Sequence, residues 1–216
     1  MEKSRSDRWR WLGLLMALVA LTMIPAARLA AEPDDLQPAA YLPLVSSPAN
    51  LLPNGGFELG RVIWQQEAKG LGADSTVLIA TRKDSTLPVL FYPYRGDWVG
   101  YLGGDTDDLD ASLWQTVTVP DGESHLYFWY WIDSLKDCPG EDYLSVQIEG
   151  QEVRRFELCK GNNTNGWQRS SPAVDLSSIE GVDVEVRFRV HIVGVAVGSL
   201  EVSVFLLDNV GWSDGP

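Results

Sequence analysis

Hydrophobic residues are densest at 126–133, where seven consecutive apolar or aromatic residues precede an aspartate. At strand period, successive side chains point to opposite faces. The two resulting faces carry Leu126, Phe128, Tyr130 and Ile132 on one side and Tyr127, Trp129, Trp131 and Asp133 on the other. A strand with one solvated face alternates cleanly between apolar and polar residues. Since this segment does not, the pattern predicts a central strand with both faces occupied, the first by the core.

Shorter runs at strand period occur through most of the chain, separated by turn signals such as Pro120-Asp121-Gly122. The further predicted strands are 76–81, 98–102, 113–119, 143–149, 152–158, 167–174, 182–191 and 200–207. In 182–191 apolar and polar residues alternate, which is typical of a strand with one wet face. No stretch has the helical period. The sequence therefore predicts an all-β fold, an antiparallel β-sandwich of about 8–10 strands.

The chain begins with a segment of a different kind. Basic residues up to Arg10 precede an apolar run that ends near Ala27, and Leu29-Ala30-Ala31 is a small-residue cleavage site. This pattern predicts a signal peptide at 1–31 and a secreted or cell-surface protein, with an uncleaved membrane anchor as the alternative. Five prolines in 32–53 predict an extended linker. The sandwich domain is expected at 54–216, with a turn at Asn54-Gly55-Gly56 and a strand from Phe57.

The chain is strongly acidic, with 17 Lys+Arg against 30 Asp+Glu. The first 31 residues hold five of the basic and two of the acidic residues, so cleavage after Ala31 would leave 12 against 28, a net charge of −16. Such a surface repels nucleic acid and anionic lipid, which makes both poor partner candidates. A membrane contact is expected only if the signal segment is retained.

Two cysteines, Cys138 and Cys159, flank the predicted strands 143–149 and 152–158. They lie nearly symmetrically about the turn at Glu149-Gly150, so they could meet across the open end of that hairpin. In an exported protein this favours one disulfide. Free or metal-bound thiols are the alternative.

The sequence contains no motif that predicts catalysis. Its two histidines, His125 and His191, have no metal-ligand spacing, and there is neither a Gly-x-Ser-x-Gly elbow nor a phosphate loop. We therefore expect a protein that is not an enzyme, with a hydrolase as a minor alternative. The acidic stretch 105–110 suits a hard cation but lacks the EF-hand pattern, and a solvated loop is favoured.

Two further carboxylates are candidates for a cation site. Glu58 lies at the predicted first strand and Asp208 at the end of the last. If the terminal strands pair, these side chains could meet, and a calcium ion would remove the cost of burying two unpaired carboxylates. Edge-exposed acids are the alternative.

The aromatic side of the 126–133 strand is the remaining functional signal. Rings on a flat sheet can stack on sugar faces or anchor a protein partner. The alternative is a second core layer. The leading hypothesis is therefore a non-catalytic binding module whose aromatic face, Tyr127, Trp129 and Trp131, recognises a glycan, with Arg187 or Arg189 as polar contacts. A protein–protein adhesion module that binds a cell-surface protein is the second hypothesis.

Several motifs resemble known extracellular modules. Asn54-Gly55-Gly56-Phe57-Glu58 with Trp64 resembles the opening of galactose-binding-like jelly-roll domains, including carbohydrate-binding modules of secreted glycosidases. The middle and the end of the chain resemble MAM-like domains and the C-terminal jelly-roll modules of immune-inhibitor-A-type bacterial peptidases. The matching stretches there are 98–104, 113–120, 126–134 and 207–210.

This resemblance implies a jelly-roll sandwich over about 54–212 and a structural calcium that joins the first strand, a neighbouring loop and the last strand. Carried over to this sequence, the calcium ligands are Glu58, Asp97 and Asp208, and Asn209 stands where a second Asp is common in those modules. The resemblance implies sugar binding, but no peptidase activity.

Overall fold

The computed structural model describes residues 51–70, 78–83, 91–196 and 199–215. The predicted signal peptide and all but the last three residues of the predicted linker lie outside these ranges. Within the described residues, no helix has the length and apolarity needed to cross a membrane. The strands are β1 (Gln65–Gly70), β2 (Ile79–Thr81), β3 (Trp98–Gly103), β4 (Leu109–Thr118), β5 (His125–Ser134), β6 (Tyr143–Ile148), β7 (Gln151–Glu157), β8 (Gln168–Arg169), β9 (Val174–Asp175), β10 (Asp183–Ile192) and β11 (Ser203–Ser213).

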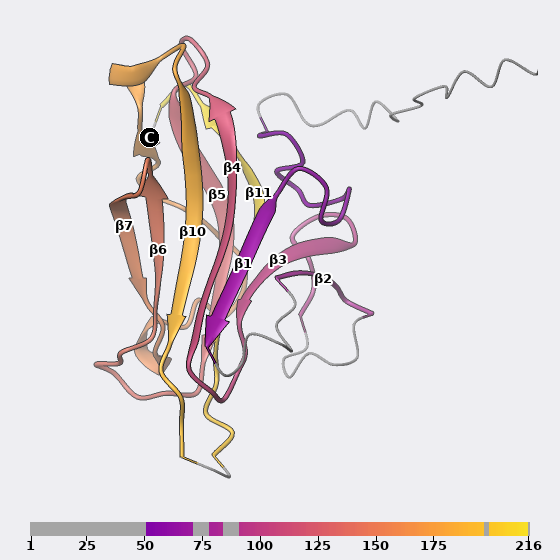
Figure 1. Ribbon diagram of the computed structural model, residues 1–216, viewed down its shortest axis with the longest axis vertical. Helices are drawn as coiled ribbons and strands as arrows, with labels where there is room; N and C mark the ends of the chain where they lie inside the picture. Colours follow the sequence, from indigo (N-terminus) through magenta and orange to yellow (C-terminus); the bar gives the residue numbers. More distant parts are fainter. Residues whose placement is uncertain (1–50, 71–77, 84–90, 197–198, 216) are drawn as a thin grey trace, which may run out of the picture. The chain divides into compact units, whose positions relative to one another are not determined.

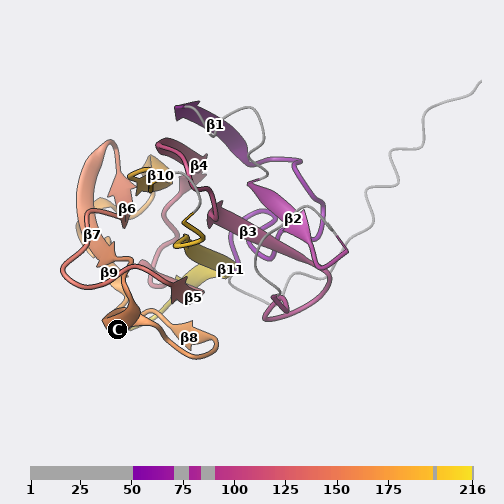
Figure 2. The same cartoon turned by 90° about the horizontal axis from the view of Figure 1, so that it is seen from below.

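These strands form two antiparallel sheets that stack face to face, as Figures 1 and 2 show. The first sheet has five strands in the order β1-β4-β10-β6-β7. The second has six, in the order β2-β3-β11-β5-β8, with β9 also paired to β5. The predicted all-β antiparallel sandwich is confirmed.

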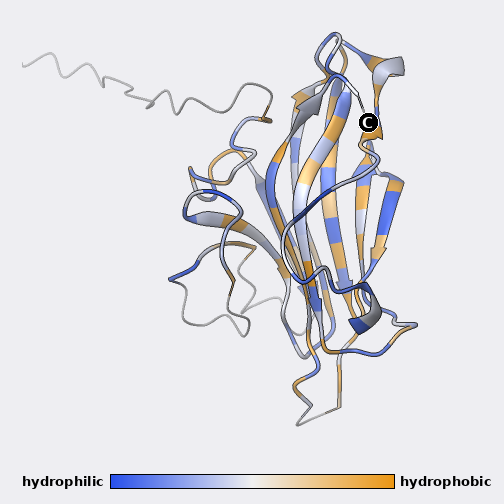
Figure 3. Ribbon diagram, turned by 180° about the vertical axis from the view of Figure 1, so that it is seen from behind, coloured by the Kyte–Doolittle hydropathy of each residue, from blue (hydrophilic) through white to orange (hydrophobic). Residues whose placement is uncertain are grey.

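The alternation along β10 determines how the five-stranded sheet is oriented. Its apolar residues, Val184, Val186, Phe188, Val190 and Ile192, are all buried in the core between the sheets. The intervening residues therefore point to the outer face of this sheet. The same alternation appears in Figure 3 as successive bands of opposite hydropathy along the long strands.

The six-stranded sheet is covered on both sides along part of its area. Leu126, Phe128 and Ile132 of β5 belong to the main core, and Tyr130 packs against it. On the outer side a second cluster of buried residues forms under loop 91–97, with Trp131 and Trp167 packed against it; its members are Ala80, Phe91, Val99, Tyr101, Val204 and Leu206. The prediction that both faces of β5 are occupied is therefore confirmed, and Trp131 contacts a second core layer.

The N-terminal boundary of the described sandwich differs from expectation. Leu51 forms a bridge with Gly211, and the backbone N–H of Leu52 donates to Val210 O at 3.0 Å. Leu52 is fully buried, so the sandwich includes residues that the sequence assigns to the linker.

Residues 54–60 form turns rather than the predicted first strand, so Glu58 lies in a turn. The physical reason is a close approach of backbones. A Cβ atom at Gly55 would lie 2.1 Å from Val210 O, and Phe57 has a φ of 61°. Phe57 nevertheless reaches the core, where its ring stacks on Trp64 at 5.1 Å between centroids. The first strand begins only at Gln65.

The predicted disulfide is confirmed. Cys138 and Cys159 are bonded to each other across the open end of the β6–β7 hairpin. Cys159 is buried, and the backbone N–H of Gly161 donates to Cys138 Sγ at 3.1 Å. The bond therefore ties the start of the hairpin to the segment that leads from β7 to β8.

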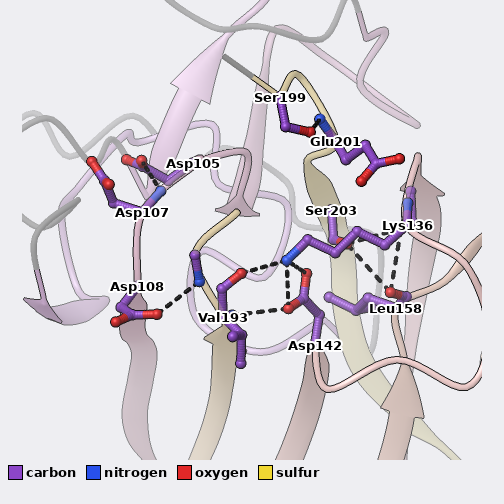
Figure 4. A network of polar contacts seen from close by, with 12 residues as sticks. Asp105, Asp107, Asp108, Lys136, Asp142, Leu158, Val193, Ser199, Glu201 and Ser203 are labelled. Atoms are coloured by element: carbon purple, nitrogen blue, oxygen red, sulfur yellow. Dashed lines mark hydrogen bonds and ion pairs between the residues drawn. The ribbon is translucent and has the colours of Figure 1, made fainter. Parts of the chain in front are cut away.

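A buried ion pair joins three segments near the same end of the sandwich (Figure 4). Lys136 Nζ lies 2.8 Å from Asp142 Oδ1 and 2.7 Å from Asp142 Oδ2, and it also donates to Val193 O. The backbone N–H of Val193 donates to Asp142 Oδ1 at 2.9 Å. Asp142 is fully buried, so this pair connects the end of β5, the start of β6 and the end of β10 inside the protein.

Candidate functional site

The five residues predicted to bind a ligand lie on two opposite outer faces. Tyr127, Trp129 and Trp131 point outward from the six-stranded sheet, because their neighbours on β5 fill the core. Arg187 and Arg189 point outward from the five-stranded sheet, because their neighbours on β10 fill the same core from the other side. The structure therefore does not bring the aromatic and arginine residues to one surface.

We call the outer side of the six-stranded sheet the aromatic face; it consists of Tyr92, Tyr94, Arg95, Tyr127, Trp129, Trp131, Trp167 and Arg169. Tyr94 stacks on Trp129 with 3.9 Å between ring centroids and an interplanar angle of 13°. Trp167 meets Trp131 edge-on at 6.3 Å, and the Arg169 guanidinium lies 4.4 Å from the Tyr127 ring centroid. Burial under these neighbours raises the pKa of Tyr127, which the nearby Arg169 charge partly offsets. All three predicted rings thus have protein groups packed against them.

Loop 91–97, which supplies Tyr94, is held in place by two carboxylates. Asp208 Oδ2 accepts the Arg95 N–H at 3.0 Å. Glu58 Oε1 accepts the N–H groups of Asp97 and Trp98, each at 3.1 Å. These hydrogen bonds determine where the loop lies over the sheet. Glu58 and Asp208 therefore hold in place the loop that packs on the aromatic face.

Burial raises the pKa of Asp208 from 3.8 to about 7, since water cannot solvate its charge. The N–H groups of Arg95, Asn209 and Tyr94 lower this pKa, and the Glu58 charge contributes to raising it; the value of about 7 is the net result. Glu58 and Asp208 thus both bind loop 91–97, which brings them to the same region of the fold.

The calcium prediction requires more than this proximity. Calcium takes six to eight oxygen ligands. Both carboxylates already accept backbone N–H bonds, and Asp97 offers Glu58 a backbone N–H. Across the part of the chain that the structure describes, no three His, Cys, Asp or Glu residues are grouped to hold a metal ion. Glu58 and Asp208 would supply only part of such a ligand set, and calcium stays a prediction.

The acidic stretch 105–110 is likewise spread out rather than convergent (Figure 4). Asp105 Oδ1 accepts the Asp107 N–H at 3.0 Å, and Asp108 Oδ1 accepts the Gly194 N–H at 2.7 Å. Asp110 lies on β4 and pairs with Arg189. These carboxylates serve different local contacts.

We call the outer side of the five-stranded sheet the polar face. Arg187 pairs with Glu185 at 2.8 Å, and its guanidinium lies 4.1 Å from the Trp114 ring centroid. Arg189 pairs with Asp110, also at 2.8 Å, and His191 Nδ1 lies 3.3 Å from the same carboxylate. The polar face therefore combines ion pairs with partly exposed rings.

Two hollows lie on the polar face. One, of about 290 Å³, is lined only by polar side chains: Glu67, Lys69, Asp110, Ser112, Gln147, Arg187 and Arg189. The other, of about 560 Å³, is lined by Gly140, Glu141, Asp142, Tyr143, Arg155, Glu157, His191 and Val193. Both draw residues from β10 and from β6 or its preceding loop, so they lie along the same part of the sheet.

The chemistry of the polar face suits a neutral ligand rich in hydroxyl groups. Each cation that lines the hollows has a carboxylate of the same face beside it, including Lys69 with Glu67 and Arg155 with Glu152, both at 2.7 Å. Charge-assisted donors and acceptors thus alternate over a face with little net charge. Hydroxyl groups can accept from the cations and donate to the carboxylates.

Sequence reasoning missed most of this site. It identified Arg187 and Arg189 but not the partners that come from β1, β4 and β6. The only sequence signal was the wet side of 182–191, which marks a polar surface without naming its neighbours. The strand order supplies those neighbours, since β10 lies between β4 and β6.

Comparison with known proteins gives structural likenesses only. No protein-family model and no curated protein matches the chain. TmCBM61 in complex with β-1,4-galactotriose is 18% identical, with a TM-score of 0.44 over 76% of this chain and 97% of that chain. The enzymatically active domain of bacteriophage CBA120 tailspike protein 4 is 17% identical, with a TM-score of 0.41 over 76% of this chain and 21% of that one.

A third structure comes from work on the promiscuous specificity of carbohydrate-binding modules of the β-sandwich superfamily. It is 14% identical, with a TM-score of 0.38 over 76% of this chain and 62% of that one. Because the TM-scores are below 0.5, these similarities do not indicate which ligand this chain binds. The two sheets themselves establish that the chain is a β-sandwich, one whose structural neighbours include carbohydrate-binding modules.

Proposed function

We propose that the chain is a non-catalytic glycan-binding module that holds a neutral glycan on its polar face. The observation that carries this proposal is the hollow of about 290 Å³, lined by seven polar side chains, five of them charged. Such a surface offers hydrogen bonds of both polarities to a sugar without an unbalanced charge. Trp114 borders it, and the Arg187 guanidinium packs over the Trp114 ring at 4.1 Å from the ring centroid.

The geometry favours the polar face over the aromatic face for this role. A sugar that stacks on a ring needs an uncovered ring face, and Tyr94 already stacks on Trp129 while Arg169 lies over Tyr127. On the polar face, the Arg189 and Asp110 side chains remain 41% and 37% exposed. Their hydrogen-bonding groups can therefore reach a ligand without rearrangement of the fold.

A glycan array and pull-down with insoluble polysaccharides would identify a ligand, and calorimetry would then compare two variants. Arg189→Ala removes one cation from the polar face, and Arg169→Ala removes one from the aromatic face. We expect Arg189→Ala to weaken binding by roughly tenfold or more, since a hydrogen bond to a charged group contributes about 1.5–3 kcal/mol, and Arg169→Ala to leave it unchanged.

Two results would contradict the proposal. One is the absence of binding to any neutral glycan on the array. The other is loss of glycan binding in Trp129→Ala plus Trp131→Ala with normal binding by Arg189→Ala, which would place the glycan on the aromatic face, as the sequence pattern suggested.

Export to the cell exterior is part of this proposal. The basic and apolar segment at 1–31 supports it, as do the disulfide between Cys138 and Cys159 and the proline-rich 32–53 segment. N-terminal sequencing of protein from the culture medium tests it, with a start near Glu32 as the expected result. A secreted protein that begins at Met1 would contradict cleavage.

A further inference from the structure

The arginines on the two outer faces have different partners. On the polar face, Arg155, Arg187 and Arg189 each lie within 2.8 Å of a carboxylate oxygen. On the aromatic face, Arg95 and Arg169 form no ion pair within the described residues. In a chain with 30 acidic and 17 basic residues, guanidinium groups with no carboxylate partner among the residues that the structure describes are unexpected.

The arginines of the aromatic face lie over tyrosine rings instead. The guanidinium of Arg169 is 4.4 Å from the Tyr127 ring centroid, and that of Arg95 is 5.8 Å from the Tyr94 centroid. At the neighbouring edge, Arg82 lies 3.9 Å from the Tyr92 centroid and donates to Tyr92 Oη at 3.0 Å.

A guanidinium that stacks on a ring keeps its N–H donors in its own plane, directed outward. Arg95 and Arg169 are both exposed, so these donors can bind a carboxylate of a partner in bidentate fashion. The Tyr127 ring, whose centroid lies 4.4 Å from the Arg169 guanidinium, packs against that group. The chain's own carboxylates lie at the two ends of the row formed by Tyr127, Trp129 and Trp131. Asp133 follows Trp131 on the same side of β5, and Glu123 lies near Tyr127.

We propose that the aromatic face is a docking surface for an acidic protein segment. Charge complementarity selects the partner, because Arg95 and Arg169 are exposed and form no ion pair with any carboxylate in the described part of an acidic chain. The residue types agree with a protein partner, since Trp, Tyr and Arg are the residues that dominate the binding energy of protein interfaces.

The mutual packing of the rings favours a protein over a polysaccharide. Tyr94 and Arg169 cover the ring faces on which a sugar would stack. The ring edges and the exposed part of Tyr92, which is 56% exposed, remain for side-chain contacts. The bonds from Glu58 and Asp208 to loop 91–97 hold this surface in one conformation, which lowers the entropy lost on binding.

The test uses the full chain and two soluble peptides. In one, glutamates alternate with tyrosines and alanines, and in the other every glutamate is replaced by glutamine. Titration calorimetry at low and at physiological salt should show binding of the acidic peptide alone, weaker at higher salt. Arg169→Ala should weaken this binding by roughly tenfold, and Arg169→Lys, which keeps the charge but not the planar fork, should weaken it less.

Lys160→Ala is the matched control, because Lys160 is exposed, lies outside both faces and has the same charge. It should bind the acidic peptide like the unmodified chain. Equal losses in Lys160→Ala and Arg169→Ala would overturn the proposal, since only net charge would then matter. Binding of the glutamine peptide with equal affinity would also overturn it, as would binding of polygalacturonate but neither peptide, or self-association through this face in sedimentation.

Discussion

The buried ion pair between Lys136 and Asp142 gives the sharpest stability prediction. Lys136→Met removes the cation but leaves a carboxylate that is fully inaccessible to solvent. The backbone N–H of Val193 is then the remaining donor to the Asp142 side chain. The substitution also removes the donor to Val193 O. Breaking a buried pair from one side costs about 3–5 kcal/mol, because the remaining charge keeps its desolvation penalty. For a domain of this size, that loss lowers Tm by about 6–20 °C.

Thermal and urea unfolding of the purified chain at pH 7 would measure this loss. The control is Lys136→Met combined with Asp142→Asn, whose amide oxygen can still accept the Val193 N–H. We expect the double variant to regain most of the lost stability, because no charge is left buried. If Lys136→Met alone cost less than about 1 kcal/mol, or if the double variant were no more stable than the single one, the electrostatic reasoning would be refuted. Asp142 also lines the larger hollow of the polar face, so glycan binding by these variants shows whether the pair shapes the site.

The other predictions concern single features of the sandwich. The pKa of Asp208 is raised from 3.8 to about 7, so between these pH values the folded protein holds a proton that the unfolded chain releases. The free energy of unfolding should therefore fall as pH rises from about 4 to 7, by at most about 4 kcal/mol. Asp208→Asn should flatten this dependence of the unfolding free energy on pH. If calcium binds Glu58 and Asp208, it should raise Tm at pH 8 more than at pH 5, and melts that EDTA leaves unchanged would rule it out. Replacing Cys138 and Cys159 by serine should cost about 3 kcal/mol in denaturant unfolding, since the bond closes a loop over a separation of 21 residues. Gln115→Met should raise Tm, because both polar side-chain atoms of this buried glutamine lack a hydrogen-bond partner within the described part of the protein. A lower Tm would show that the Gln115 amide has hydrogen-bond partners in solution.

The strands with one buried side were accessible from the sequence. The alternation in 182–191 predicted β10, and the alternation in 113–119 predicted most of β4. Burial of every second residue requires apolar side chains at alternate positions, so the strand period is visible in the sequence. The strand β1 was missed for the same reason. It lies at the edge of its sheet, and five of its six residues are exposed, so no buried side imposes a pattern on them.

The candidate sites were only partly accessible. Periodicity placed Tyr127, Trp129 and Trp131 together and Arg187 with Arg189, since residues two apart on a strand share a face. It could not show that these groups lie on opposite sides of the sandwich. Nor could it show that Tyr94, from a loop before β3, would stack on Trp129.

The sequence by itself predicted the all-β class, the core-facing side of the alternating strands and one disulfide between the two cysteines. These depend on local alternation and on a short hairpin, in which the interacting residues are close along the chain. Only the tertiary structure decided that Asp110, Gln147 and Arg189 line one hollow, or that Arg169 lies over Tyr127. Such contacts depend on strand order and on loops that cross a sheet. Many strand orders bury the same alternating residues equally well, so the pattern along the chain does not distinguish among them.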